Sequence, residues 1–441
     1  MEKVFRPWNV DQSWLLPPSV HELVPANHPA HFVRELVRSE LDLTAIYAGY
    51  DERRGYPPYH PAMMTALLLY GYTQGLFSSR KLARACEERV DVMAVTAMQR
   101  PDFRTIAAFR LRHLDALSGL FVQVLRLCQR ADLVRLGHVA LDGTKIKANA
   151  SKSKAMSYRR MLATEARLRA EVEAWFDKAR AADDSEEAAL GQERGDQLPT
   201  WVVNRQQRLE RIAEARAAIE AEAHAEAEAR RKARDDDDAP PPPAHPKHHA
   251  DGTPGSDAQR NFTDPESRIL KTRDGYVQGY NAQLAVDDKN QIIVAADLVA
   301  AQNDVACLVP MLDQIKRNNR AQAAELSADC GYLSEDNLRA CRRRRISAYI
   351  ATGRQRHGDD GPTARRAYSQ PLTRAMTRKL RRGGYRSRYR LRKQVVEPVI
   401  GQIKSALGFR AFLLRGLRKV RAEWTLVTTA HNLLKLARAT A

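Results

Sequence analysis

The spacing of apolar residues divides the chain into a helical first third and a later part in which strands alternate with helices. In the first third, apolar residues recur every three or four positions over residues 60–72, 79–89 and 105–120. This spacing is the helical period. Pro61 stands where a first helical turn tolerates proline. The pattern predicts an all-α N-terminal domain over residues 1–133.

Basic side chains are frequent in these predicted helices. The six residues concerned are Arg80, Lys81, Arg84, Arg104, Arg110 and Arg112. One interpretation is a solvated helical surface, and the other is a DNA-end-binding domain of the helix-turn-helix kind. The pattern alone leaves both interpretations open.

Two short apolar runs further along the chain each end on an aspartate. One run ends at Asp142, which Gly143 follows, and the other ends at Asp329, two residues before Gly331. Such runs favour short strands with an acid at the tip. Glycine there lets a substrate approach the backbone closely. If the two strands are neighbours, Asp142 and Asp329 lie side by side.

The remaining pattern predicts a mixed sheet with an insertion. Residues 279–286 and 291–298 read as a β-hairpin, and residues 304–317 as an amphipathic helix. A helix near 334–345 and a strand over 346–351 continue the alternation. Residues 152–262 hold two long helices, broken near 191–199, and an Asp- and Pro-rich flexible linker from about 235 to 259. The expected fold class is therefore α/β, a mixed sheet flanked by helices, over residues 134–441.

The net charge of the chain indicates which class of molecule it binds. The 441-residue chain has 72 Lys and Arg against 53 Asp and Glu, a net charge of +19. This surplus favours a polyanion such as nucleic acid, because neutralising phosphates releases counterions. Five scattered cysteines indicate neither a disulfide framework nor a zinc knuckle. With no apolar run of ~18 residues and no leader pattern, we expect a cytoplasmic protein.

Glu397 is a third candidate acid for an electrostatic reason. Residues 381–420 contain twelve Lys or Arg and one acid, Glu397 itself. It is either a salt-bridged surface residue or part of a site. An apolar stripe on its helix would dock it against the sheet, and Lys404 near the same face could contact a phosphate. Pro398 indicates that the helix starts or kinks there.

Together these acids suit phosphodiester chemistry. Cutting and rejoining DNA strands needs one metal to activate the nucleophile and another to stabilise the leaving oxygen, ~3.5–4 Å apart. Mg²⁺ prefers oxygen ligands and uses few protein carboxylates. Asp142, Asp329 and Glu397 would meet that need if folding brings them together.

Several segments of the chain carry a family resemblance. They are HPAMM (60–64), RTIAAFR (104–110), LDGTKIKANAS (141–151), NFTDPES (261–267), GYNAQ (279–283), ADCGY (328–332) and YRLRKQVVEPVIGQIK (389–404). The chain resembles bacterial insertion-sequence transposases of the DDE class. Its last segment is similar to their Tyr-Arg-Glu-Lys signature, with four residues instead of three between Arg392 and Glu397, so Lys393 is an alternative to Arg392.

The resemblance implies a ribonuclease-H-like catalytic domain. Asp142, Asp329 and Glu397 would be the catalytic, metal-binding acids, holding two Mg²⁺ ions for which Mn²⁺ could substitute. The resemblance also implies a set of DNA-contacting residues. These are Lys145, Tyr389, Arg392, Lys393 and Lys404.

The function implied is a DNA transposase that binds the terminal inverted repeats of an insertion sequence and catalyses strand cleavage and strand transfer. Its partners would be double-stranded DNA, at the repeats and the target, and a second copy of the chain that synapses two ends. No membrane is involved, and the protein would associate with the nucleoid when bound to DNA. Two alternatives stay open: a catalytically silent transposase-derived DNA-binding regulator, and another nuclease on the same fold, such as a junction resolvase.

Overall fold

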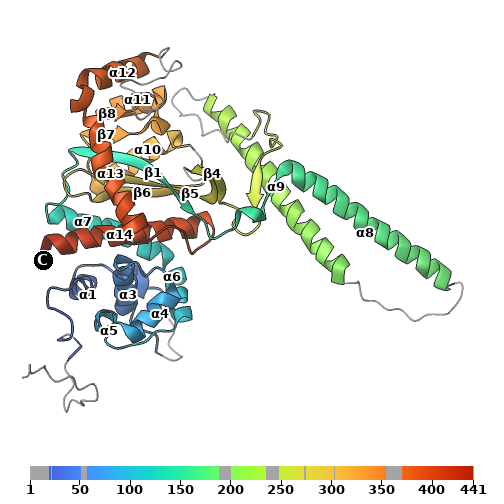
Figure 1. The fold of residues 1–441 in the computed structure, drawn as a ribbon, viewed down its shortest axis with the longest axis horizontal. Helices are drawn as coiled ribbons and strands as arrows, with labels where there is room; N and C mark the ends of the chain where they lie inside the picture. Colours follow the sequence, from blue (N-terminus) through green and yellow to red (C-terminus); the bar gives the residue numbers. More distant parts are fainter. Residues whose placement is uncertain are drawn as a thin grey trace, which may run out of the picture. The chain divides into compact units, whose positions relative to one another are not determined.

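The computed structural model describes residues 19–20, 22–50, 57–187, 200–234, 248–272, 275–301, 303–353 and 370–440 (Figure 1). The chain forms two compact units. The first unit comprises Met1–Val124 with Leu433–Ala441, and the second unit is Leu125–Asn432. The predicted break at 191–199 and the Asp- and Pro-rich run at 235–247 lie outside the described residues.

The first unit is built from short helices. Their bounds are α1 Pro29–Ser39, α2 Thr44–Tyr47, α3 Pro61–Thr73, α4 Ser79–Glu88, α5 Val90–Thr96, α6 Phe103–Arg112 and α7 Leu114–Arg130, which continues into the second unit. The helix α3 carries apolar residues on all of its faces, and nearly all of its residues are buried, so it lies at the centre of this core. The helical pattern predicted over 105–120 corresponds to two helices, because α6 ends at Arg112, His113 leaves helical geometry and α7 begins at Leu114.

Arg110 does not belong to the basic surface predicted for this unit. It is only 5% exposed, and its guanidinium donates to the Tyr72 hydroxyl at 3.0 Å and the Phe77 carbonyl at 3.1 Å. Those bonds give Arg110 a structural role. Arg80 and Arg104 are exposed and lie over the Phe103 ring.

A six-stranded mixed sheet forms the core of the second unit. The strands are β1 His138–Lys147, β4 Arg268–Thr272, β5 Gly275–Asp287, β6 Ile293–Val299, β7 Glu325–Ala328 and β8 Ser347–Ile350. Their order is β4-β5-β1-β7-β8, and β6 also pairs with β5. β5 is antiparallel to β1, β4 and β6, while β7 is parallel to both β1 and β8. The predicted hairpin and mixed sheet are confirmed.

Helices cover this sheet. Figure 1 shows α13 (Leu391–Gly401) crossing the sheet, where it packs on β1 and β5. The helix α10 (Leu308–Asn319) packs on β6, whereas α11 (Glu335–Arg343) and α12 (Pro371–Gly383) pack on β8. Residues 278–287 of β5 are buried without alternation, which means that both faces of this strand are covered. The chain ends in α14 (Leu417–Thr440).

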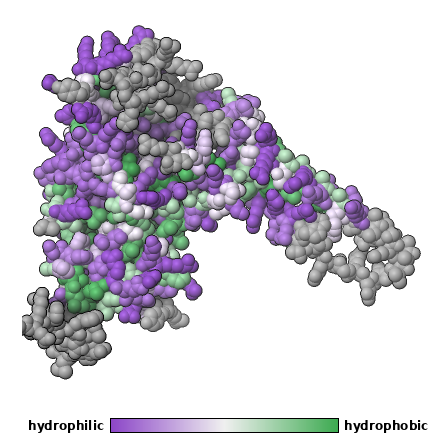
Figure 2. All heavy atoms as spheres, viewed as in Figure 1, coloured by the Kyte–Doolittle hydropathy of each residue, from purple (hydrophilic) through white to green (hydrophobic). Residues whose placement is uncertain are grey.

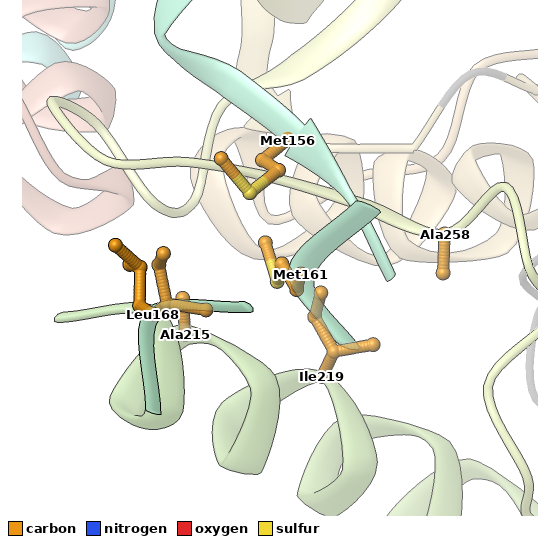
Figure 3. Close-up of a cluster of buried hydrophobic side chains, with 7 residues drawn as sticks. Met156, Met161, Leu168, Ala215, Ile219 and Ala258 are labelled. Carbon is orange, nitrogen blue, oxygen red and sulfur yellow. The ribbon is translucent and has the colours of Figure 1, made fainter. Parts of the chain in front are cut away.

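The insertion contains the two predicted long helices, α8 (Tyr158–Glu187) and α9 (Thr200–Arg234), which pack against each other. A short two-stranded sheet of β2 (Ala155–Ser157) and β3 (Gln259–Asn261) adjoins them. Figure 3 shows side chains from β2, α8, α9 and the segment before β3 meeting in one buried cluster, including Met161, Ile219 and Ala258. Ala258, assigned by sequence to the flexible linker, thus contributes to a packed core.

Hydrophilic residues cover most of the face drawn in Figure 2, and hydrophobic residues form smaller patches there. Across the described ranges, no helix combines the length and apolar character that crossing a bilayer would require.

Candidate active site

Parallel pairing of β1 with β7 brings Asp142 next to Asp329. Leu141 pairs with Ala328 in the register, and each of these residues is followed at once by one of the two acids. The prediction that Asp142 ends a strand is wrong, because β1 continues to Lys147 through its antiparallel pairing with the longer β5. Asp142 therefore lies in the middle of a strand, at the point where pairing with β7 stops.

The Asp142 carboxylate is nearly buried and has two partners. Its Oδ1 accepts the Gly143 N–H at 2.9 Å, and its Oδ2 accepts a hydrogen bond from the Arg392 guanidinium. Burial raises the pKa of Asp142 to about 7; Arg392 opposes this shift, whereas the charges of Asp329 and Asp304 add to it. Burial likewise raises the pKa of Asp329, and Asp304 adds to that shift. The site thus gathers negative charge in a poorly solvated place.

Arg392 links the first and third predicted acids. Its second ion pair joins Nη2 to Glu397 Oε1 at 3.1 Å. The side chains of Asp142 and Arg392 are 13% and 12% exposed, but that of Glu397 is 47% exposed. Glu397 therefore lies at the open side of the site. Lys393 is exposed on the same helix, so Arg392 is the basic residue that reaches the acids.

The other predicted DNA contacts surround this centre. Tyr389 lies in a one-turn helix before α13, with the Arg392 guanidinium carbon 6.0 Å from its ring centre. Lys404 Nζ donates a hydrogen bond to the Lys145 carbonyl at 2.9 Å. This bond connects the helical turn that follows α13, residues Gln402–Ala406, to β1. Burial lowers the pKa of Lys404. Burial raises the pKa of Asp329, and the positive charge of Lys145 opposes that rise.

Pro398 neither starts nor ends α13, so of the two sequence-based expectations for this position, a start or a kink, the start is wrong. The helix begins at Leu391 and passes through Pro398 to Gly401, and a π-helical turn, Gln402–Ala406, follows. Proline has no N–H to donate to the carbonyl four residues earlier. That carbonyl, of Gln394, instead accepts a hydrogen bond from the Gln291 side chain at 3.2 Å. This replacement partner lets the helix run uninterrupted past Glu397.

Sequence reasoning missed a further acid, Asp304, which it used only to mark the start of a helix. Asp304 Oδ1 accepts hydrogen bonds from Asn281 at 2.7 Å and from Gln283 at 2.8 Å. The signal available was the pair Asn281 and Gln283. Two amide side chains on one face of an otherwise apolar buried strand need polar partners.

The donors at this site suit a divalent cation. Asp142, Asp304 and Asp329 offer oxygen atoms, which Mg²⁺ and Mn²⁺ prefer. A Cβ at Gly331 would lie 2.9 Å from Asp329 Oδ1 and 3.0 Å from Asp304 Oδ2, so the glycine leaves room between these carboxylates. In the described ranges, no three acidic, His or Cys side chains are already arranged around one ion position. The charged partner of Asp142 in this structure is Arg392, which pairs with its Oδ2.

Comparisons with known proteins point to two family models. The model described as "Transposase DDE domain" matches residues 248–433, which include Asp329 and Glu397 but not Asp142. The model described as "Transposase domain (DUF772)" matches residues 18–112, within the helical first unit. Neither the curated proteins nor the solved structures gave a significant match to the chain.

Proposed function

This chain belongs to the insertion-sequence DDE transposases, and from that premise we propose that it binds the terminal inverted repeats of its element and catalyses metal-dependent strand cleavage and strand transfer. The observation that carries the proposal is the adjacency of Asp142 and Asp329 across β1 and β7, with Arg392 joining Asp142 to Glu397. The family generally uses divalent metals. We propose two Mg²⁺ ions here, for which Mn²⁺ can substitute.

We assign residues 134–441 to a ribonuclease-H-like catalytic domain that the helical insertion interrupts. The strand path β6-β5-β1-β7-β8, in which β5 alone runs against its neighbours, supports this assignment. The neighbouring strands β1 and β7 carry the two aspartates, Asp142 within β1 and Asp329 directly after β7, and α13, packed on β1 and β5, carries the glutamate. Acids from distant sequence positions thus come to one edge of one sheet.

Bound divalent ions would activate the attacking oxygen and stabilise the leaving oxygen. The residues of the chain prepare for this. Asp142 and Asp329 supply oxygen ligands from rigid strands, and Glu397 supplies one from the exposed side. Arg392 neutralises Asp142 before metal and DNA arrive; its planar guanidinium then turns to a DNA phosphate, which it can bind with two parallel hydrogen bonds.

The remaining basic residues are assigned to DNA contacts. Lys145, Lys393, Lys404 and Tyr389 lie around the acids on β1, on α13 and on the turns flanking α13. We assign end recognition to residues 1–133, where Arg80 and Arg104 remain exposed. We further propose that a homodimer synapses the two ends of the element.

A cleavage assay with end-labelled inverted-repeat DNA tests the catalytic assignment. In Mg²⁺ or Mn²⁺, Asp142→Asn, Asp329→Asn and Glu397→Gln should bind the DNA without nicking it. The matched control is Asp313→Asn, which removes a half-exposed acid paired with Arg344 and should nick normally. Full nicking by any of the three variants would remove that acid from the site.

The same assay separates the alternatives. A wild-type protein that binds the repeats and nicks with neither metal would be the silent DNA-binding regulator. A preference for branched DNA over linear ends would instead indicate a junction resolvase.

Arg392→Gln should weaken DNA binding and lessen its salt dependence, because one phosphate contact is lost.

A further inference from the structure

A chain of hydrogen bonds that begins on β5 fixes the orientation of the Asp304 carboxylate. Asn281 and Gln283, two positions apart on β5, both donate to its Oδ1. Gln283 has little freedom, because its side-chain oxygen accepts the hydroxyl of the fully buried Tyr332. That bond sets the amide so that its NH₂ group points at Asp304. Oδ1 is therefore anchored, and the position of Oδ2 follows from it.

The second oxygen, Oδ2, faces the catalytic acids. It lies 3.0 Å from the position that a Cβ of Gly331 would occupy, and Asp329 Oδ1 lies 2.9 Å from the same position. On its other side, Asp304 Oδ1 lies 2.7 Å from a Cβ built on Gly143, the residue after Asp142. Asp304 thus fills the space between the segments that carry Asp142 and Asp329.

Nothing in the described part of the chain neutralises this carboxylate. There, both of its side-chain hydrogen bonds go to Oδ1, and no Lys, Arg or His pairs with it. Gathering like charges in a poorly solvated place is costly unless a cation joins them. Among the described residues, the guanidinium that pairs with acids of this site is that of Arg392, which binds Asp142 and Glu397.

We propose that Asp304 is a fourth acid of the metal site, whose Oδ2 binds a divalent ion together with Asp329. This inference rests on the proposed function and extends it by one ligand. The two amide donors and Tyr332 account for a rigid placement of the carboxylate. The glycine at 331 accounts for the close approach of Asp304 Oδ2 and Asp329 Oδ1 to one point. A purely structural acid at this place would need neither that approach nor the nearby acids.

The test is a titration of the full-length protein with Mn²⁺, without DNA, followed by isothermal calorimetry. Asp304→Asn is the sharpest variant, because the Asn oxygen can keep both bonds to Asn281 and Gln283 while an NH₂ group replaces Oδ2. The apparent Mn²⁺ affinity should fall by about 10-fold to 100-fold. Asp313→Asn, which also removes one negative charge from the same region of the sequence, should leave it unchanged.

Parallel titrations of several variants distinguish a failure of this inference from a failure of the proposed function. If Asp142→Asn and Asp329→Asn weaken Mn²⁺ binding but Asp304→Asn does not, the fourth-ligand proposal is overturned and the proposed function stands. If none of these variants changes the affinity, the metal site itself is wrong. A drop in melting temperature for Asp304→Asn with unchanged Mn²⁺ affinity would show a structural role and also overturn the inference.

A second variant covers the case in which Asp304→Asn does not fold. Asp304→Cys places a soft sulfur ligand near the position of the Asp304 carboxyl carbon, on the side of the proposed ion, so it should shift the preference of the protein from Mg²⁺ towards Cd²⁺. Wild-type protein and Asp313→Cys provide the reference preference. An unchanged order of preference in Asp304→Cys would place the side chain outside the metal's ligands.

Discussion

Two sets of acids in the second unit differ in their exposure and in their partners: one set is fully buried, and the other is partly exposed. The capped acids, Asp264, Asp287 and Glu423, are held by N–H groups of the backbone. Asp287 accepts from three of them, those of Arg135, Leu136 and Lys289. Glu423 binds the N–H groups of Leu413 and Leu414, and Asp264 binds that of Gly416 and the Tyr280 hydroxyl. These bonds need no ligand.

The site acids, Asp142, Asp304 and Asp329, face one another and a single guanidinium. Burial raises the pKa of Asp287 as it does that of Asp142 and Asp329, so a raised pKa does not separate the two sets. Their acidic neighbours do separate them, since Asp142 and Asp329 also accept one backbone N–H each. An acid surrounded by backbone donors completes the fold, whereas acids gathered beside other acids require a cation from outside.

The largest expected difference concerns catalysis. Asp329→Asn keeps the shape of the side chain and its bond to the Gly331 N–H, but removes a metal ligand. Strand cleavage should slow by about a thousandfold or more, since metal assistance supplies several kcal/mol to such reactions. Single-turnover rates on labelled ends measure this. A capped-acid variant, Asp287→Asn, should cleave at the wild-type rate per folded molecule, and equal losses in both would erase the distinction between the sets.

Stability should show the opposite ranking. In Asp287→Asn, an NH₂ group replaces one oxygen, and at least one buried backbone N–H loses its acceptor. The free energy of unfolding should fall by about 1–3 kcal/mol. Asp304→Asn should cost less in metal-free protein, because it removes an unneutralised charge. Urea unfolding with EDTA present measures both, and a larger loss for Asp304→Asn would contradict this ranking.

The space at Gly331 offers a smaller test. An added methyl group would press on the carboxylates of Asp329 and Asp304, so Gly331→Ala should weaken Mn²⁺ binding by about tenfold. Gly401→Ala is the matched control, because a Cβ there meets nothing within 4 Å. Calorimetric titration compares the two variants. Unchanged affinity in Gly331→Ala would mean that the gap between the carboxylates is not used by an ion.

The smallest effect is a dependence of metal binding on pH. Metals bind the deprotonated carboxylate, and the pKa of Asp142 is raised to about 7, so the apparent Mn²⁺ affinity should fall by up to about tenfold per pH unit below 7. Without metal the sign reverses. Because the folded-state pKa exceeds the ordinary 3.8, the stability that Asp142 contributes is present below about pH 4 and lost as the pH rises through 7.

Melting curves between about pH 5 and pH 8, with EDTA or with Mn²⁺, measure these opposite trends. Asp142→Asn removes the titrating group and serves as the control, so its curves should lack the component centred near pH 7. If wild type and Asp142→Asn depend on pH in the same way, Asp142 does not titrate in this range.

The sequence by itself determined the strands that carry the acids. Apolar runs ending on Asp142 and Asp329 predicted the two strands, although not that they are neighbours, and the polar turn at residues 287–290 predicted the β5–β6 hairpin. These features depend on the alternation of side chains and on local turn chemistry, which neighbouring residues decide. The apolar stripe around Glu397 likewise predicted a helix docked on the sheet.

Only the tertiary structure decided the partners of each charge. The sequence pattern placed Arg110 on the surface, but in the structure it is buried and binds Tyr72 and Phe77. Similarly, the structure shows that Arg392, and not Lys393, pairs with Asp142. Asp304 joins the site because β5 and the turn after β7 bring its partners there from distant positions. Such contacts depend on which elements meet in space, and the spacing of residues along one chain segment carries no record of that.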